Sequence, residues 1–108
     1  MTKKLVVIPT YNESENIADI ISDILKLNLD ILIVDDNSPD NTSKIVMEHK
    51  DFDSKVFLLS RKEKLGLGSA YREGFQKGIN MKYEYFLTKN MVPLKQFFIT
   101  RNMIQIFQ

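Results

Sequence analysis

The sequence contains no cysteine, and no aspartate occurs after Asp53. The lack of cysteine excludes disulfides and thiolate metal sites, and it fits a reducing compartment. No apolar run approaches the roughly 18 to 20 residues of a membrane-spanning helix. The apolar run that follows the N-terminal lysines is also too short for a secretory signal. These absences predict a cytoplasmic protein.

The composition is that of one small globular domain, with 108 residues of which 44% are hydrophobic and 27% charged. The charges are segregated along the chain. Residues 1–53 hold 11 acidic and 5 basic residues, whereas residues 54–108 hold 3 acidic and 10 basic residues. The bases of the second half are scattered and are not interleaved with regularly spaced aromatics, so they predict a solvated or phosphate-facing surface and no nucleic-acid partner.

Strand and helix patterns alternate along the first 88 residues. Residues 5–9 form a β-branched run typical of a strand buried on both faces. Asn12 and Glu15 have capping-box spacing ahead of an amphipathic helix with apolar residues from Ile17 to Leu25. Further elements are predicted as a strand at 31–34, a helix from Asp40 or Thr42 to Lys50, a strand at 56–59, a helix ending near Ile79 and a strand at 83–88. This alternation predicts an α/β fold with a mostly parallel sheet and helices on both faces.

Acidic residues follow the first two predicted strands. Glu13 comes soon after the first strand, and Asp35 and Asp36 end the second. Ligands of open α/β sheets bind at the carboxyl ends of the strands, where carboxylates accept hydrogen bonds from a ribose or base, or bind a divalent cation. The alternative is that Asp36 and Asp40 cap the next turn and helix.

The loop before the third predicted helix is basic and contains glycine. Gly66 and Gly68 either present main-chain N–H groups to a phosphate or simply make a tight turn, because the spacing matches no complete phosphate-binding fingerprint. Arg61, Lys62 and Lys64 either add charge toward a diphosphate or are solvated. The sequence shows no Ser/His/Asp or Cys/His nucleophile system.

Three motifs together resemble a known family. They are Val7-Ile-Pro-Thr-Tyr-Asn-Glu13, then Ile33-Val-Asp-Asp-Asn-Ser-Pro-Asp40 with Thr42, then Leu65-Gly-Leu-Gly-Ser-Ala70 with Gly74-Phe75. In order and spacing they are similar to the opening of the inverting GT-A glycosyltransferases of family 2, and most similar to the polyprenol (dolichol) phosphate mannosyltransferases. The resemblance implies a three-layer, Rossmann-like GT-A nucleotide-binding half.

The resemblance also implies a site and an activity. Pro9, Tyr11 and Glu13 would line the nucleoside pocket, and Val34 and Asp36 would hold the base and ribose. The donor would be GDP-mannose and the acceptor a polyprenyl phosphate, joined by a single inverting displacement at the anomeric carbon. Mg²⁺ or Mn²⁺ would neutralise the diphosphate leaving group.

The sequence departs from the family where the metal is normally held. The family's Asp-X-Asp motif follows the fourth strand, but this chain has Lys89-Asn-Met-Val-Pro there. Lysine, methionine and valine do not replace hard carboxylate ligands. We therefore expect no metal ligands and no catalytic residue, with residues 1–88 as the donor-binding part and 89–108 as a divergent tail. The expected product is a fragment, truncated or disrupted in frame near residue 89.

The missing remainder has further implications. The intact family enzyme would associate with the cytosolic face of a membrane, and a partner chain could complete the fold here. Apolar side chains normally covered by the remainder would then be exposed, namely Phe97, Phe98, Ile104, Ile106 and Phe107.

Two other functions would account for parts of this sequence. Residues 31–36 resemble the first strand of a response-regulator receiver, but a receiver needs a later aspartate, which is absent after Asp53. A non-catalytic nucleotide-binding or interaction module stays open as the alternative to a transferase.

Overall fold

A five-stranded sheet forms the centre of the computed structural model, which describes residues 4–94 and 99–106. The strands are β1 (Lys4–Thr10), β2 (Asp30–Asp35), β3 (Val56–Ser60), β4 (Tyr85–Thr88) and β5 (Ile99–Thr100). Their order across the sheet is β3-β2-β1-β4-β5, with β5 antiparallel to β4 and the other pairs parallel. The predicted mostly parallel sheet is confirmed.

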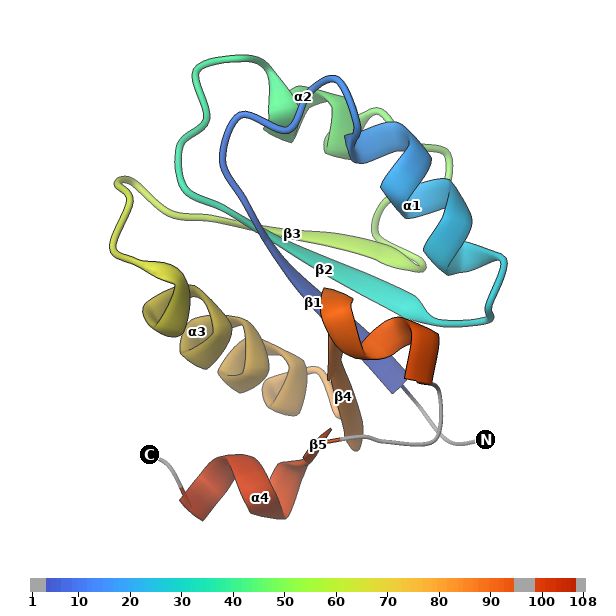
Figure 1. Cartoon of the computed structure of the whole chain (residues 1–108), viewed down its shortest axis with the longest axis vertical. Coiled ribbons are helices and arrows are strands. Elements are labelled where there is room, and N and C mark those ends of the chain that lie inside the picture. The colour runs from blue at the N-terminus through green and yellow to red at the C-terminus, as the bar shows by residue number, and fades with distance from the viewer. Residues whose placement is uncertain (1–3, 95–98, 107–108) are drawn as a thin grey trace.

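Helices cover both faces of the sheet and give the predicted three layers (Figure 1). The helical segments are α1 (Ile17–Leu25), α2 (Thr42–Met47), α3 (Leu67–Asn80), α4 (Arg101–Ile106) and the 3-10 helix η1 (Lys89–Leu94). The helices α1 and α2 pack with η1 on one face, and α3 and α4 pack on the other. The chain progresses from β1 to β3 in one direction and then returns to place β4 on the other side of β1. Such a switch in strand order is where open α/β sheets form a ligand crevice.

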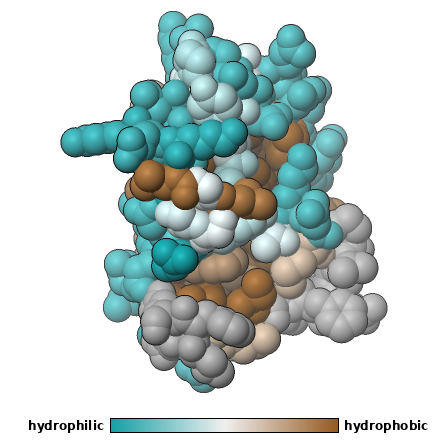
Figure 2. Space-filling model, turned by 60° about the vertical axis from the view of Figure 1, so that its left-hand side comes forward, coloured by the Kyte–Doolittle hydropathy of each residue, from teal (hydrophilic) through white to brown (hydrophobic). Residues whose placement is uncertain are grey.

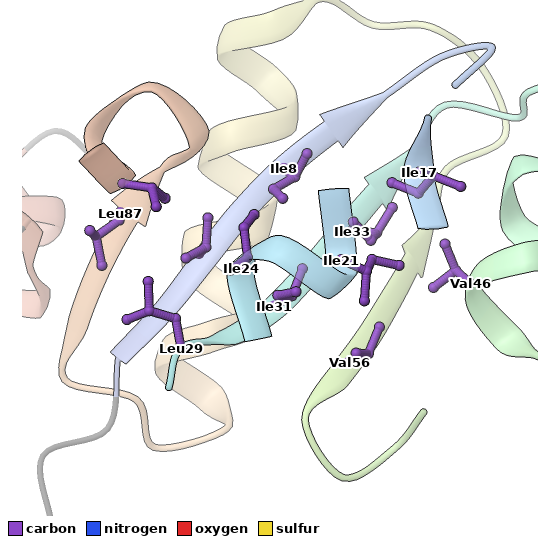
Figure 3. Close-up of a cluster of buried hydrophobic side chains, with 12 residues drawn as sticks. Ile8, Ile17, Ile21, Ile24, Leu29, Ile31, Ile33, Val46, Val56 and Leu87 are labelled. Carbon is purple, nitrogen blue, oxygen red and sulfur yellow. The ribbon is translucent and has the colours of Figure 1, made fainter. Parts of the chain in front are cut away.

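The spacing of apolar residues predicted for the first helix explains how α1 packs on the sheet. Residues spaced three and four apart share one helix face, which therefore carries a continuous apolar stripe. Figure 3 shows this stripe above the isoleucines of β1 and β2. The buried residues of this contact are Ile17, Ile21 and Ile24 from α1, with Ile8, Ile31 and Ile33 from the strands.

Two glycines set the distance between α3 and the sheet. A Cβ at Gly74 would lie 2.5 Å from Cγ1 of Val7, and one at Gly78 would lie 2.7 Å from Cδ2 of Leu5. The glycines are four residues apart and so face the same side of the helix. The structure therefore explains why Gly74 belongs to the motif, since a larger residue would push α3 away from β1.

The predicted capping box at Asn12 is wrong. α1 begins at Ile17, and Asn12 has a left-handed main chain with φ of 56°. The N–H groups of Asn16 and Ile17 both donate to the main-chain carbonyl of Glu13, so a turn precedes the helix. Asn12 instead donates its N–H to Oγ of Ser38 in the next loop, because the two loops are tied together.

Other element boundaries differ by a few residues. α2 ends at Met47, short of the predicted Lys50, and β4 begins at Tyr85 rather than Tyr83. Tyr83 therefore lies in the connection before β4, where its hydroxyl donates a hydrogen bond to the carboxylate of Asp30. Burial and this hydrogen bond both raise the pKa of Tyr83.

Residues after Thr88 form η1, β5 and α4, a region for which the sequence had no clear period. Ile104 of α4 is buried among the α3-side residues, so the expectation that its side chain is exposed is wrong. The corresponding predictions for Phe97, Phe98 and Phe107, and for the side chain of Ile106, lie outside the described residues.

Candidate functional site

A cavity of about 130 Å³ lies at the carboxyl ends of β1 and β2. One wall comes from the end of β1 and the other from the loop before α3, with the residue after β2 between them. The lining residues are Pro9, Thr10, Tyr11, Asp36, Lys64, Gly66, Leu67 and Ala70. The cavity therefore combines an aromatic ring, a carboxylate and an ammonium group within one small space.

Three of the five predicted site residues line this cavity: Pro9, Tyr11 and Asp36. The side chain of Val34 is fully buried and does not line the cavity, and its Cγ2 would lie 3.0 Å from a Cβ added at Gly74. Glu13 is half-buried in the adjoining turn and does not line the cavity. The nucleoside roles of all five residues stay predictions.

Asp36 is held by a buried ion pair with Arg61. Nε of Arg61 lies 2.6 Å from one carboxylate oxygen of Asp36, and Nη2 lies 2.9 Å from the other. The two side chains are only 4% and 9% exposed, Arg61 first. Such a bidentate pair fixes the plane of the carboxylate as well as its charge. Asp36 does not cap the next turn or helix, which was the alternative role for this residue.

Arg61 also joins β3 to α3. Its Nη1 donates to Oγ of Ser69 at 2.7 Å and to the carboxylate of Glu73, and its Nη2 donates to the carbonyl of Gly66 at 3.4 Å. The carboxylates of Asp36 and Glu73 raise the pKa of Arg61, chiefly through the hydrogen bonds that Arg61 donates to Asp36. The expectation that Arg61 directs its charge toward a diphosphate is not met, because both ends of its guanidinium already have partners.

The sequence analysis did not pair Arg61 with Asp36, although a signal exists. β2 and β3 are parallel, with Asp35 opposite Ser60. The residues that follow these two positions are Asp36 and Arg61, so an acid and a base leave neighbouring strands at the same level. Counting onward from the strand ends would have placed the two charges side by side.

Asp35 has a structural role that separates it from Asp36. It is 1% exposed, and its carboxylate accepts hydrogen bonds from the hydroxyls of Thr10, Ser38 and Ser43 at 2.6, 2.7 and 2.9 Å. The main-chain N–H of Ser38 donates to the same carboxylate. Asp35 therefore ties the end of β1 to the loop between β2 and α2.

The loop after β1 is fastened to the loop after β2 through three consecutive main-chain N–H groups. They donate to side chains of the second loop: Asn12 to Ser38 Oγ at 2.9 Å, Glu13 to Thr42 Oγ1 at 3.1 Å and Ser14 to Asp40 Oδ2 at 3.0 Å. These contacts hold the turn that follows Tyr11 in one conformation.

Asp40 anchors this fastening. It also accepts the main-chain N–H and the hydroxyl of Thr42 at the start of α2. The N-cap of α2 is Asn41 rather than the predicted Asp40 or Thr42, so Asp40 acts from one residue before the cap. Hydrogen bonds from Thr42 and Ser14 stabilise the ionised carboxylate and lower the pKa of Asp40 to about 2. The loop therefore depends on an ionised Asp40.

Lys64 lies over the ring of Tyr11. Its Nζ is 4.8 Å from the ring centroid, within the range of a cation–π contact. Tyr11 is 42% exposed, and both side chains line the cavity. Lys64 thereby links the loop before α3 to the end of β1.

The residues after β4 do not fit the metal ion that the family resemblance implies. η1 has the sequence Lys-Asn-Met-Val-Pro-Leu, which offers no carboxylate. Within residues 4–94 and 99–106, no group of three histidine, cysteine, aspartate or glutamate side chains is arranged to hold a metal. The nearby Asp35 and Asp36 are instead occupied by hydroxyl groups and by Arg61.

A larger, apolar groove of about 370 Å³ lies between α3 and α4. Figure 2 shows hydrophobic side chains gathered low on this face of the molecule. Its main apolar lining residues are Tyr71, Phe75, Ile99, Met103 and Ile104. In the part of the chain that the structure describes, no helix has the length and apolar character needed to cross a bilayer.

The structure is an α/β protein with a small polar cavity at the carboxyl ends of its parallel strands. Residues 5–88 match the sequence profile of glycosyl transferase family 2. The chain belongs to glycosyl transferase family 2, which confirms the family expected from the three motifs.

Two relatives illustrate this membership. The chain is 40% identical over 84 residues to the polyprenol monophosphomannose synthase of Mycolicibacterium smegmatis, covering 75% of this chain and 32% of that protein. It is 36% identical over 85 residues to an uncharacterised protein of Methanocaldococcus jannaschii, covering 77% of this chain and 37% of that protein. The chain thus spans about a third of the length of these relatives.

Solved structures show the same fold. The crystal structure of Staphylococcus aureus TarS residues 1–349 in complex with UDP superimposes with a TM-score of 0.67 at 22% identity, over 81% of this chain and 26% of that one. The TarS 1–349 structure described without UDP gives a TM-score of 0.64 at 22% identity, over 82% and 27%. The predicted GT-A fold is confirmed.

Proposed function

We propose that residues 1–88 bind the nucleoside of a sugar-nucleotide donor in the cavity at the ends of β1 and β2. The observation that carries this proposal is the convergence of Pro9, Tyr11 and Asp36 on that one cavity. Tyr11 offers a ring face to a base, and the carboxylate of Asp36 accepts a hydrogen bond from a ribose hydroxyl. Glu13 would act from the adjoining turn, and Val34 through its main chain alone, because its side chain is buried.

The donor and acceptor are inferred from similarity. The name of the Mycolicibacterium relative, polyprenol monophosphomannose synthase, supports mannose as the sugar and a polyprenyl phosphate as the acceptor. We infer that GDP-mannose is the donor of the corresponding whole enzyme, which transfers mannose with inversion at the anomeric carbon.

We further propose that the 108-residue chain binds the donor without transferring its sugar. The residues that follow β4 carry no carboxylate to hold Mg²⁺ or Mn²⁺ beside a diphosphate. This composition favours the second candidate function, a non-catalytic nucleotide-binding module with residues 89–108 as a divergent tail. Family membership and missing catalysis are compatible, because the nucleoside residues lie before residue 88.

Binding is tested by titrating the purified 108-residue protein with GDP, GDP-mannose and UDP in a calorimeter. We expect saturable binding of GDP and GDP-mannose. Tyr11→Ala should weaken it roughly tenfold, because stacking of a base on an aromatic ring is worth about 1–3 kcal/mol. The matched control is Leu27→Ala, which removes another exposed apolar side chain far from the cavity. Absence of binding, or equal binding by the two variants, would overturn the proposal.

Transfer is tested separately with radiolabelled GDP-mannose, a polyprenyl phosphate and Mn²⁺. The Mycolicibacterium synthase serves as the positive control under the same conditions. We expect no labelled lipid from the 108-residue chain. A labelled lipid would refute the non-catalytic proposal while leaving the proposed donor intact.

A further inference from the structure

We infer that Lys64 contacts the diphosphate of a bound nucleoside diphosphate, and that it leaves the ring of Tyr11 to do so. The inference rests on the proposed function and adds to it the residue that recognises the phosphate groups. Three observations carry it: the partners of the neighbouring cations, the size of the cavity and the freedom of the loop that carries Lys64.

Of the three basic residues at the start of this loop, only Lys64 is placed to meet an anion in the cavity. Arg61 is buried and binds the carboxylates of Asp36 and Glu73. Lys62 is exposed and is not among the lining residues, whereas Lys64 is the one cationic side chain among the described residues that line the cavity. A lysine ammonium is a compact charge well suited to phosphate oxygens.

The present position of Lys64 restricts the cavity. At about 130 Å³ the cavity is smaller than the roughly 300 Å³ at which typical ligand pockets begin. The Lys64 ammonium also occupies one face of the Tyr11 ring, where a base would stack. Moving Lys64 therefore enlarges the cavity and frees the ring in the same step.

The loop offers little resistance to this movement. Residues 62–65, which include Lys64, are all exposed, so a movement of this part of the loop disturbs no buried packing. Gly66 has φ of 96° and nothing within 4 Å of an added Cβ, which leaves space around the turn. The far end of the loop is fixed, because the Gly66 carbonyl accepts a hydrogen bond from Arg61 and α3 is packed on the sheet through Gly74. The loop can thus swing while both of its ends stay in place.

The charges of the cavity favour an anion at Lys64. Asp36 is already paired with Arg61, and Lys64 is the one cationic side chain among the described lining residues, so an anion that enters the cavity would meet its ammonium group. A bound diphosphate replaces the cation–π contact with an ionic hydrogen bond, which is the stronger interaction. The nucleoside part of the ligand would then occupy the space between Tyr11 and Asp36.

The test compares Lys64→Met with Lys62→Met, because both changes remove one exposed positive charge from the same loop. Each protein is titrated with GDP and with guanosine, and with UDP and uridine. We expect Lys64→Met to weaken nucleoside diphosphate binding roughly tenfold or more, as for loss of a hydrogen bond to a charged group, and to leave nucleoside binding unchanged or tighter. Lys62→Met should change neither affinity more than about twofold.

The outcomes separate this inference from the proposed function. If the wild-type protein binds nucleotide and both lysine variants weaken nucleotide binding equally, the cause is the overall positive charge of the loop. The assignment of Lys64 is then overturned. If Lys64→Met weakens nucleoside binding as much as nucleoside diphosphate binding, Lys64 contacts the nucleoside, and the assignment is again wrong. If the wild-type protein binds no nucleotide, the proposed function falls together with the inference.

Discussion

Replacing Arg61 by methionine should destabilise the fold strongly, because it breaks the ion pair on which the cavity is built. The Arg61 and Asp36 side chains are 4% and 9% exposed. Removing one partner of a buried pair leaves an unpaired buried charge, which costs about 3–5 kcal/mol. Since small domains are stable by only about 5–15 kcal/mol, Arg61→Met should lose a large share of the free energy of unfolding. Urea unfolding followed by far-UV circular dichroism measures it.

Glu73→Gln is the matched control for this experiment. The Glu73 side chain contacts the same guanidinium but is 50% exposed, and solvent-exposed ion pairs contribute about 0–1 kcal/mol. We therefore expect Glu73→Gln to change the free energy of unfolding by less than about 1 kcal/mol. A double variant, Asp36→Leu with Arg61→Met, should recover most of the loss, because apolar replacement of a whole buried pair is often neutral. The reasoning is refuted if Arg61→Met costs less than about 1 kcal/mol or if Glu73→Gln costs as much.

Two further predictions concern the packing of α3 and the acid stability of the loops. Gly74→Ala should lower the free energy of unfolding by about 1–3 kcal/mol through overpacking, because its Cβ would lie 2.5 Å from Cγ1 of Val7. Gly68→Ala is the control and should not destabilise the protein, because nothing lies within 4 Å of its Cβ. The midpoints of urea unfolding measure both effects. The pKa of Asp40 is lowered from 3.8 to about 2, so its stabilising effect should be complete above pH 4 and lost as the pH falls toward 2. Asp40→Asn should remove this part of the pH dependence of unfolding, and an unchanged acid profile would contradict the role of Asp40.

The sequence predicted the centre of the sheet well because β1 and β2 are buried on both faces. The continuous apolar runs that begin at Leu5 and Ile31 have no polar face that would allow a helix of similar length. The sequence also placed Asp35 and Asp36 correctly at a strand end. It did not assign their different partners, since those depend on which strands are neighbours. Arg61 became a partner of Asp36 only through the parallel register of β2 and β3.

The failed cap at Asn12 has a similar cause. Capping-box spacing describes a local arrangement, in which a side chain satisfies the N–H groups of its own helix. Here Ser38 takes the N–H of Asn12, and Thr42 takes that of Glu13, from a loop that is distant in the sequence. A long-range contact therefore displaced the local one, and the helix started later at Ile17. Sequence spacing alone does not reveal such a competition between two loops.

The two walls of the cavity hold their charged groups differently, which would suit the proposed recognition of a nucleotide in two parts. On the nucleoside side, Arg61 takes one hydrogen-bond position from each oxygen of Asp36. An ionised carboxylate has about four such positions, so Asp36 keeps acceptors for a ribose while its orientation is already fixed. Fixing a group before binding reduces the entropy lost on binding. On the other wall, Lys64 lies in an exposed stretch of the loop before α3 and contacts only the ring of Tyr11 among the interactions described above. Under the proposed function, the fixed carboxylate of Asp36 would select the nucleoside and the ammonium of Lys64 would neutralise the diphosphate.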